Sequence, residues 1–95
     1  MTYKLRFQEQ ACAEWQRLDG SVRGQLKKKL AERMEHPRVP SAALYGMPDC
    51  YKIKLKSIGY RLVYQVQDEV LFVTVIVIGE RDRSRVYVDA KDRME

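Results

Sequence analysis

The segment that most limits how this chain can fold is Tyr51–Tyr64, which has the pattern of a β-hairpin. In each half of the segment, apolar residues alternate with polar ones, and in a strand successive side chains point to opposite faces. Both apolar rows can face one core only if the connection has an even number of residues, either Ser57–Ile58 or Lys56–Gly59. Gly59 can supply the positive φ that such a turn needs.

The face opposite the apolar rows is strongly basic. With either connection, Lys54 lies opposite Arg61, and Lys52 lies opposite Val63. Like charges directly opposite each other destabilise a sheet. One interpretation is a solvated strand whose lysines discourage edge pairing. The other is a surface that binds an anion, and the rest of the chain favours it.

The composition is that of one globular domain spanning 1–95. Hydrophobic residues make up 45% and charged residues 33%, and 95 residues can form a modest core without a metal or disulfide. Lysine and arginine number 18 against 13 acidic residues, which gives a net charge of +5. This balance favours an anionic partner, with nucleic acid as the first candidate.

Cysteine and histidine usage predicts neither a disulfide nor a metal site. Cys12 and Cys50 are far apart in sequence, and His36, the single histidine, is not spaced as a ligand. We therefore expect two buried thiols in a reducing compartment and no cofactor. The N-terminus has no apolar signal segment, and the longest apolar run, Val70–Ile78, is too short to span a bilayer. These features predict a cytoplasmic protein with no membrane contact.

The N-terminal half predicts one strand followed by two helices. Tyr3–Phe7 alternates as a short strand does, and Glu9–Leu18 has apolar residues at helical spacing, with Trp15 in the core. A second helix is expected over Val22–Glu35, with Ser21 as its N-cap.

The C-terminal half completes an α+β fold. Ser41–Leu44 fits either an extra turn of helix or an extended edge, and Gln67–Asp68 marks a turn. Glu69–Gly79 is apolar on both faces and predicts the central strand, and Val86–Met94 predicts a marginal terminal helix. We expect two N-terminal helices packed on one face of an antiparallel sheet. The other face stays partly open, and the basic side chains of the hairpin point there.

The polar side of the second predicted helix carries a cluster of cations, namely Arg23, Lys27, Lys28 and Lys29. A solvated helix face is one interpretation. The alternative is a ridge that contacts phosphates, because three adjacent lysines cannot all be stabilised by opposite-charge pairs. Lys56 in the hairpin turn and Arg83 in the C-terminal polar run are further candidates for RNA contacts.

The polar inventory narrows the chemistry. The sequence has no nucleophilic triad, no metal-ligand spacing and no glycine-rich phosphate loop. What remains are cations and a tyrosine that could bind a phosphodiester and stabilise its developing charge: Lys52, Lys54, Arg61, Arg81, Arg83, Arg85 and Tyr87. RNA carries its own nucleophile, the 2′-OH, so cleaving it needs orientation, charge stabilisation and proton transfer.

Four segments carry a resemblance to a known family: Leu26–Leu30, Gly46–Leu55, Gly59–Gln65 and Gly79–Tyr87. In sequence and spacing they resemble the RelE toxins of bacterial toxin–antitoxin modules, over nearly the whole chain without gaps. The resemblance implies a microbial-ribonuclease-like fold of the RelE/ParE superfamily and cleavage of mRNA in the ribosomal A site by 2′-OH attack. It also implies a RelB-type antitoxin as partner, and operator DNA bound only through the antitoxin complex.

The same resemblance implies roles for five residues. Lys54 is the candidate general base, and Lys52 and Arg61 would stabilise the phosphate. Arg81 is the candidate acid or leaving-group stabiliser, and Tyr87 would stack on or help activate the nucleotide. Whether Lys54 or Tyr87 acts as the base stays open.

Two positions depart from the family pattern, with Tyr45 in place of an arginine and Glu80 in place of a lysine. Both reduce the local positive charge. Two other functions remain as alternatives. One is a ParE-like gyrase inhibitor, which would not need the five-residue set, and the other is a basic module that binds nucleic acid without cleaving it.

Overall fold

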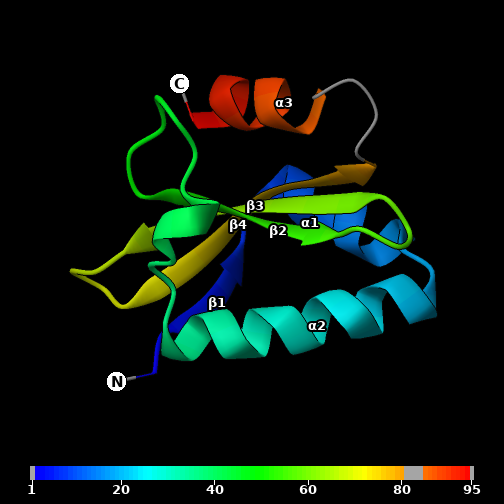
Figure 1. Cartoon of the computed structure of the whole chain (residues 1–95), viewed down its shortest axis with the longest axis horizontal. Helices are drawn as coiled ribbons and strands as arrows, with labels where there is room; N and C mark the ends of the chain where they lie inside the picture. Colours follow the sequence, from blue (N-terminus) through cyan, green and yellow to red (C-terminus); the bar gives the residue numbers. More distant parts are fainter. Residues whose placement is uncertain (1, 81–84, 95) are drawn as a thin grey trace.

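The computed structural model describes residues 2–80 and 85–94, which form a four-stranded sheet with helices on both faces (Figure 1). The elements in chain order are β1 (Lys4–Phe7), α1 (Glu9–Arg17), α2 (Gly20–Glu35), the 3₁₀ turn η1 (Pro40–Ala42), β2 (Cys50–Leu55), β3 (Tyr60–Gln67), β4 (Phe72–Glu80) and α3 (Arg85–Met94). The predicted α+β class and the order of its elements are confirmed.

The sheet has the order β1-β4-β3-β2 and is mixed, not purely antiparallel as the sequence predicted. β2, β3 and β4 are antiparallel neighbours, whereas β1 runs parallel to β4 with Lys4 beside Phe72 and Phe7 beside Val75. Parallel neighbours need a long crossover connection, and the two helices after β1 supply it. The side-chain alternation of a short strand does not encode its direction, which is why the sequence left this point undetermined.

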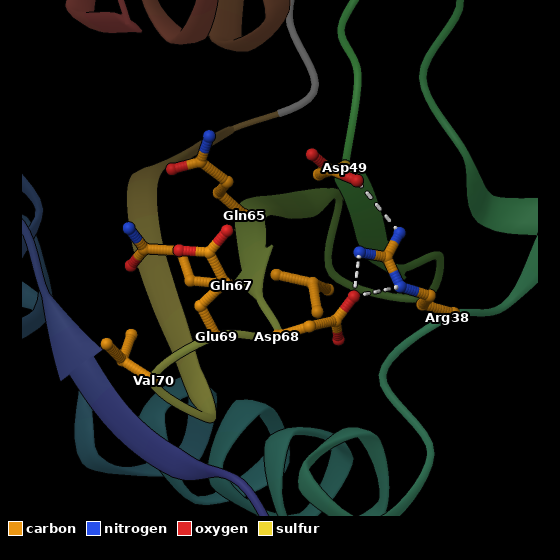
Figure 2. A pocket seen from close by; sticks show the side chains of 8 residues that line it. Arg38, Asp49, Gln65, Gln67, Asp68, Glu69 and Val70 are labelled. Carbon is orange, nitrogen blue, oxygen red and sulfur yellow. Dashed lines mark hydrogen bonds and ion pairs between the residues drawn. The ribbon is translucent and has the colours of Figure 1, made fainter.

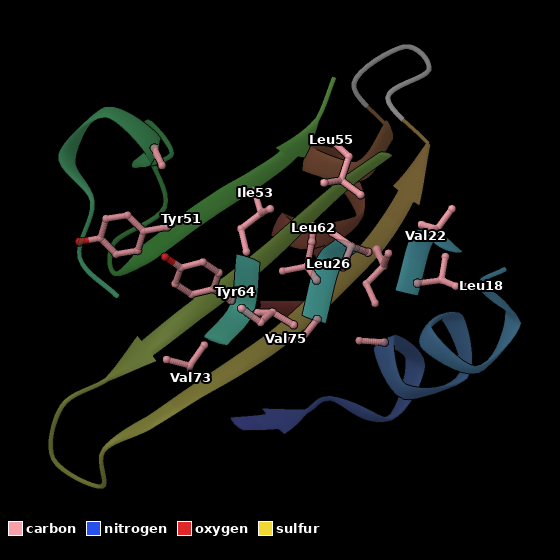
Figure 3. Packing of buried hydrophobic residues seen from close by; sticks show 14 of the residues in the cluster. Leu18, Val22, Leu26, Tyr51, Ile53, Leu55, Leu62, Tyr64, Val73 and Val75 are labelled. Atoms are coloured by element: carbon pink, nitrogen blue, oxygen red, sulfur yellow. The ribbon is translucent and has the colours of Figure 1, made fainter. Parts of the chain in front are cut away.

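One face of the sheet packs against α1 and α2 and holds the larger core (Figure 3). Leu26 and Leu30 of α2 are fully buried against Ile53 of β2 and Leu62 of β3. These are the apolar rows expected from the hairpin alternation, and they lie on one face. Trp15 also packs as expected, with its ring centroid 5.1 Å from that of Phe7.

The other face of the sheet is covered by α3, so the prediction that helices cover β4 on one face only is wrong (Figure 1). Val86 and Ala90 of α3 are buried against Val63 and Val77 in a second, smaller cluster. This burial explains why β4 is apolar on both faces. The terminal helix forms with Val86 and Ala90 on its packed side, as the sequence predicted.

Several element boundaries differ from the prediction. The second helix begins at Gly20 after Asp19, so Ser21 lies inside the helix and is not its N-cap. β4 begins at Phe72 instead of Glu69, because the turn extends to Leu71, which has a positive φ of 57°. In the disputed segment both readings hold in part, since a 3₁₀ turn is followed by a bridge between Ala43 and Tyr51.

The hairpin turn spans Lys56–Gly59, the longer of the two expected connections, and Gly59 has the positive φ of 69°. Cys50 is buried and Cys12 is only partly so, because Cys12 is rotated off the buried stripe of α1 that contains Ala11. Both thiols are free. Within the described ranges, none of the helices has the length and apolar character needed to cross a bilayer.

Candidate active site on the hairpin

The β2–β3 register sets the basic residues beside one another. Lys54 pairs with Arg61 and Lys52 with Val63, as the sequence predicted. Because Val63 packs against α3, the side chains of Lys52, Lys54 and Arg61 lie on the α3 face of the sheet. Lys54 is exposed, and Lys52 and Arg61 are partly exposed. A patch of three cations is therefore fixed on two rigid strands.

The helix α3 brings Tyr87 to this patch from a distant part of the sequence. Arg61 Nη1 donates a hydrogen bond of 2.7 Å to the Tyr87 hydroxyl, and the guanidinium carbon lies 5.6 Å from the centre of the tyrosine ring. A hydroxyl that accepts from a cation keeps its own proton available for donation. The tyrosine therefore lies in contact with the cationic patch and can donate a hydrogen bond outward.

The approach of α3 depends on a glycine. Arg61 pairs across the sheet with Gly79, and a Cβ at position 79 would lie 3.0 Å from Val86 Cγ2. The first turn of α3 thus rests directly on the backbone of β4 beside Arg61. A larger residue at position 79 would push this turn, and Tyr87 with it, off the sheet.

Electrostatic crowding acts on Lys54. Repulsion from Lys52 is the largest cause, followed by repulsion from Arg61, and together they lower the pKa of Lys54 below its ordinary value of 10.5. A lowered pKa increases the fraction of neutral amine near neutral pH, which a general base requires. The same crowding makes the patch a strong site for an anion such as phosphate.

The other predicted site residues are distributed differently. Arg81 and Arg83 lie outside the described residues. The lysine ridge (Lys27, Lys28 and Lys29) is exposed along α2, and Lys28 and Lys29 line a hollow of about 520 Å³ together with Leu55 at the end of β2. Arg23 is instead partly buried and donates to the carbonyl of Leu18, which stabilises the α1–α2 junction.

The two departures from the family pattern lie at the surface. Tyr45 is fully exposed in the loop before β2. Glu80 is exposed at the end of β4, where it pairs with Tyr60. Lys56 is exposed in the hairpin turn, next in sequence to the patch. In the described part of the chain, no group of three or more His, Cys, Asp or Glu side chains is arranged to hold a metal ion.

Sequence reasoning missed a second polar site, centred on Arg38 (Figure 2). Its guanidinium lies 2.9 Å from a carboxylate oxygen of Asp49 and 2.6 Å from one of Asp68, and it also donates to the Tyr51 hydroxyl. Hydrogen bonds from Tyr3 and Arg38 lower the pKa of Asp68. The cation is neutralised by two carboxylates, so this site ties loops together and is not set up to bind phosphate. Its partners are more than ten residues apart, and no local pattern could reveal them.

Arg33 is a further residue that the sequence did not single out. It donates to the Tyr64 hydroxyl at 2.9 Å and to the backbone carbonyl of Lys52 at 3.1 Å. The Tyr64 hydroxyl donates in turn to the carbonyl of Pro37. Arg33 therefore fastens α2 to the outer edge of β2, at the strand that carries the site lysines.

Comparisons with known proteins agree with this geometry. Residues 5–85 match the family of ParE toxins of type II toxin–antitoxin systems (parDE). The mRNA interferase toxin RelE of Escherichia coli strain K12 is 57% identical over 94 residues, which cover 99% of each chain. This chain belongs to the RelE toxin family. A putative RelE-like toxin protein of Escherichia coli is 50% identical over the same coverage.

Solved structures of RelE toxins share the fold. A double arginine-to-alanine variant of Escherichia coli RelE in the free state matches with a TM-score of 0.92 and 55% identity over all of both chains. The toxin in the intact Escherichia coli RelBE toxin–antitoxin complex matches with a TM-score of 0.82 and 58% identity, covering 85% of this chain and 99% of that one. The RelE resemblance that the sequence suggested is confirmed.

Proposed function

We propose that this chain is the toxin of a type II toxin–antitoxin module and an endoribonuclease that cuts mRNA in the ribosomal A site. The observation that carries the proposal is the hydrogen bond between Arg61 and Tyr87, which brings Tyr87 into the cationic patch of the hairpin. The full-length identity to a protein named as an mRNA interferase supports the same activity.

In the proposed reaction, the 2′-OH of the mRNA attacks the adjacent phosphate. Lys54, whose pKa is lowered by its cationic neighbours, removes the proton from the 2′-OH. Lys52 and Arg61 stabilise the negative charge that develops on the phosphate oxygens. Tyr87 stacks on the base or donates its proton, and Arg81 stabilises the leaving oxygen.

The patch contains no pair of a carboxylate and a histidine, so the acid–base groups are weak at neutral pH. Orientation of the substrate by the ribosome would then supply a large part of the rate enhancement. The lysine ridge, Arg23, Lys56 and Arg83 are the proposed contacts to ribosomal RNA. The proposed site of action is the cytoplasm.

We further propose a RelB-type antitoxin as the inhibitor, with operon autoregulation carried out by the complex and operator DNA reached only through it. Support comes from Escherichia coli RelE, whose structure is known in complex with its antitoxin and with an antitoxin RelB peptide. An acidic antitoxin segment could pair with the exposed cations of the hairpin face. Co-expression with a RelB-type antitoxin should abolish toxicity and yield a stable complex.

Primer extension on programmed ribosomes tests the proposal. We expect a new cut in the A-site codon with the wild-type chain, and a loss of roughly 100- to 10,000-fold in single-turnover rate for Lys54→Ala. Lys4→Ala is the matched control, because Lys4 is an exposed lysine of β1 at the opposite edge of the sheet. Equal cutting of free RNA would contradict the dependence on the ribosome.

The match to the ParE family keeps a second candidate, inhibition of DNA gyrase. The two functions differ in their target, so a supercoiling assay with purified gyrase separates them. We expect no inhibition of supercoiling. Inhibition together with intact mRNA on ribosomes would favour the gyrase function. Absence of both effects would leave a basic module that binds nucleic acid.

A further inference from the structure

An ion pair joins the two helices that flank the outer edge of β4. Arg93 in the last turn of α3 contacts Glu14 of α1 through two parallel bonds, Nη1 to Oε1 at 2.8 Å and Nη2 to Oε2 at 2.9 Å. The Arg93 side chain is 14% exposed and the Glu14 side chain 25%. The pair is bidentate and largely shielded from solvent, and such pairs fix geometry more strongly than single surface contacts.

The same two side chains bind the backbone of β4. Arg93 Nη1 donates to the Ile76 carbonyl at 2.8 Å, and the Ile78 N–H donates to Glu14 Oε1 at 3.1 Å. The pairing of β1 with β4 ends at Val75, directly before these residues. Glu14 and Arg93 therefore take over the edge hydrogen bonds of β4 where β1 stops, and they link α1, β4 and α3 at one point.

The helix that carries Tyr87 needs such an anchor. α3 has ten residues, and helices of this length are marginal in water unless they are packed. Its first turn rests on Gly79 through Val86, and its last turn is held by Arg93. Tyr87 lies between the two anchors and contacts Arg61. A loose last turn would let the helix pivot on Val86 and move the tyrosine.

We propose that Glu14 and Arg93 are positioning residues for the cleavage reaction. Their ion pair fixes α3 against β4 and so keeps the Tyr87 hydroxyl on Arg61. Neither residue belongs to the cationic patch, and both act through Tyr87. This inference rests on the proposed function for its effect on rate, but the positioning itself can be measured without cleavage.

The first test measures the position of α3 directly. Arg93→Lys keeps the charge but loses the planar fork that reaches Glu14 and Ile76 together, and Glu14→Gln keeps the size but removes the charge. We expect each variant to accelerate hydrogen exchange of the α3 amides at least about 10-fold and to shift the ring resonances of Tyr87. Lys91→Gln and Glu9→Gln are the controls, since both residues are exposed on the same two helices, and neither variant should change either signal.

The second test measures the rate. With ribosomes saturating, Arg93→Lys should lower the single-turnover cleavage rate roughly 10- to 100-fold and leave ribosome affinity within about twofold. Combined with Tyr87→Ala, it should cost less than the product of the two single losses, because both changes remove the same contact. A purely structural role for the ion pair predicts independent, multiplicative effects instead.

The outcomes separate this inference from the proposed function. If the wild-type chain cuts no mRNA but Arg93→Lys still releases α3 and moves Tyr87, the proposed function fails and the positioning is established. Unchanged α3 exchange and unchanged Tyr87 resonances in both ion-pair variants would overturn the positioning, whether or not the wild-type chain cleaves. Multiplicative rate losses in the double variant would likewise overturn the action through Tyr87.

Discussion

Replacing Gly79 by alanine should disturb the site through a single methyl group. The added Cβ would lie 3.0 Å from Val86 Cγ2, closer than an ordinary carbon contact, so the first turn of α3 must shift. Overpacking of this kind costs about 1–3 kcal/mol. The loss of backbone freedom in the unfolded chain offsets about 0.4–1 kcal/mol of that cost. We expect a net destabilisation of about 1–2 kcal/mol.

Thermal unfolding and single-turnover cleavage together provide the assay. For a domain of this size, the expected destabilisation lowers Tm by roughly 4–16 °C. Because the shift moves Tyr87 away from Arg61, the cleavage rate should fall more than ribosome affinity does. Adding Val86→Ala to Gly79→Ala removes the clashing methyl and should restore part of the rate.

Gly24→Ala is the matched control. Gly24 lies in the interior of α2, and a Cβ there would have nothing within 4 Å. The same change of residue should therefore stabilise the protein, by about 0.5–1 kcal/mol, through helix propensity. Refutation would come from a Gly79→Ala variant that is as stable as Gly24→Ala and cuts at the wild-type rate. Such a result would mean that α3 does not rest on Gly79.

Three further predictions concern charge and burial. Lys52→Gln removes the largest cause of the lowered pKa of Lys54, so the pKa of Lys54 should rise and the basic limb of the pH–rate profile should move to higher pH. Because that pKa is lowered in the folded state, the unfolded chain binds the proton more tightly, and wild-type stability should increase with pH between the folded value and 10.5 by urea titration; a decrease would contradict the sign. Changing the whole lysine ridge to alanine should weaken ribosome association and reduce its salt dependence by about 0.7 per lost contact, with the saturating rate nearly intact, whereas unchanged association would make the ridge a solvated face. Tyr64→Phe should destabilise the fold by about 1–3 kcal/mol in urea because it leaves the Pro37 carbonyl without its 2.7 Å donor, and Tyr51→Phe, whose hydroxyl meets a half-exposed arginine, should cost clearly less.

The parts of the fold that follow local rules could be predicted from the sequence. Alternation over Tyr51–Tyr64 defined which residues face the core, and parity alone restricted the turn and placed Lys54 opposite Arg61. The helical spacing of Val86 and Ala90 predicted the packed side of α3. Each of these depends on a period and on neighbours within about ten residues.

What the sequence left undetermined depends on contacts between distant segments. The parallel pairing of β1 with β4, the seat of α3 on Gly79 and the Glu14–Arg93 ion pair join residues far apart in the chain. Neither partner in such a contact has a periodic or compositional signal. For Tyr87 the family resemblance named the residue, but only the structure gives its contact with Arg61.

The arrangement also explains how so small a domain tolerates a repulsive patch. The face toward α1 and α2 buries most of the large apolar side chains, including Leu26, Leu30 and Tyr64, and so carries most of the stability. The face toward α3 has a smaller cluster and holds Lys52 and Lys54. Because stability and charge are separated by the thickness of one sheet, neutralising a cation on the α3 face relieves repulsion without opening the main core. Changes that abolish the chemistry should therefore leave a folded protein, whereas changes on the opposite face should unfold it.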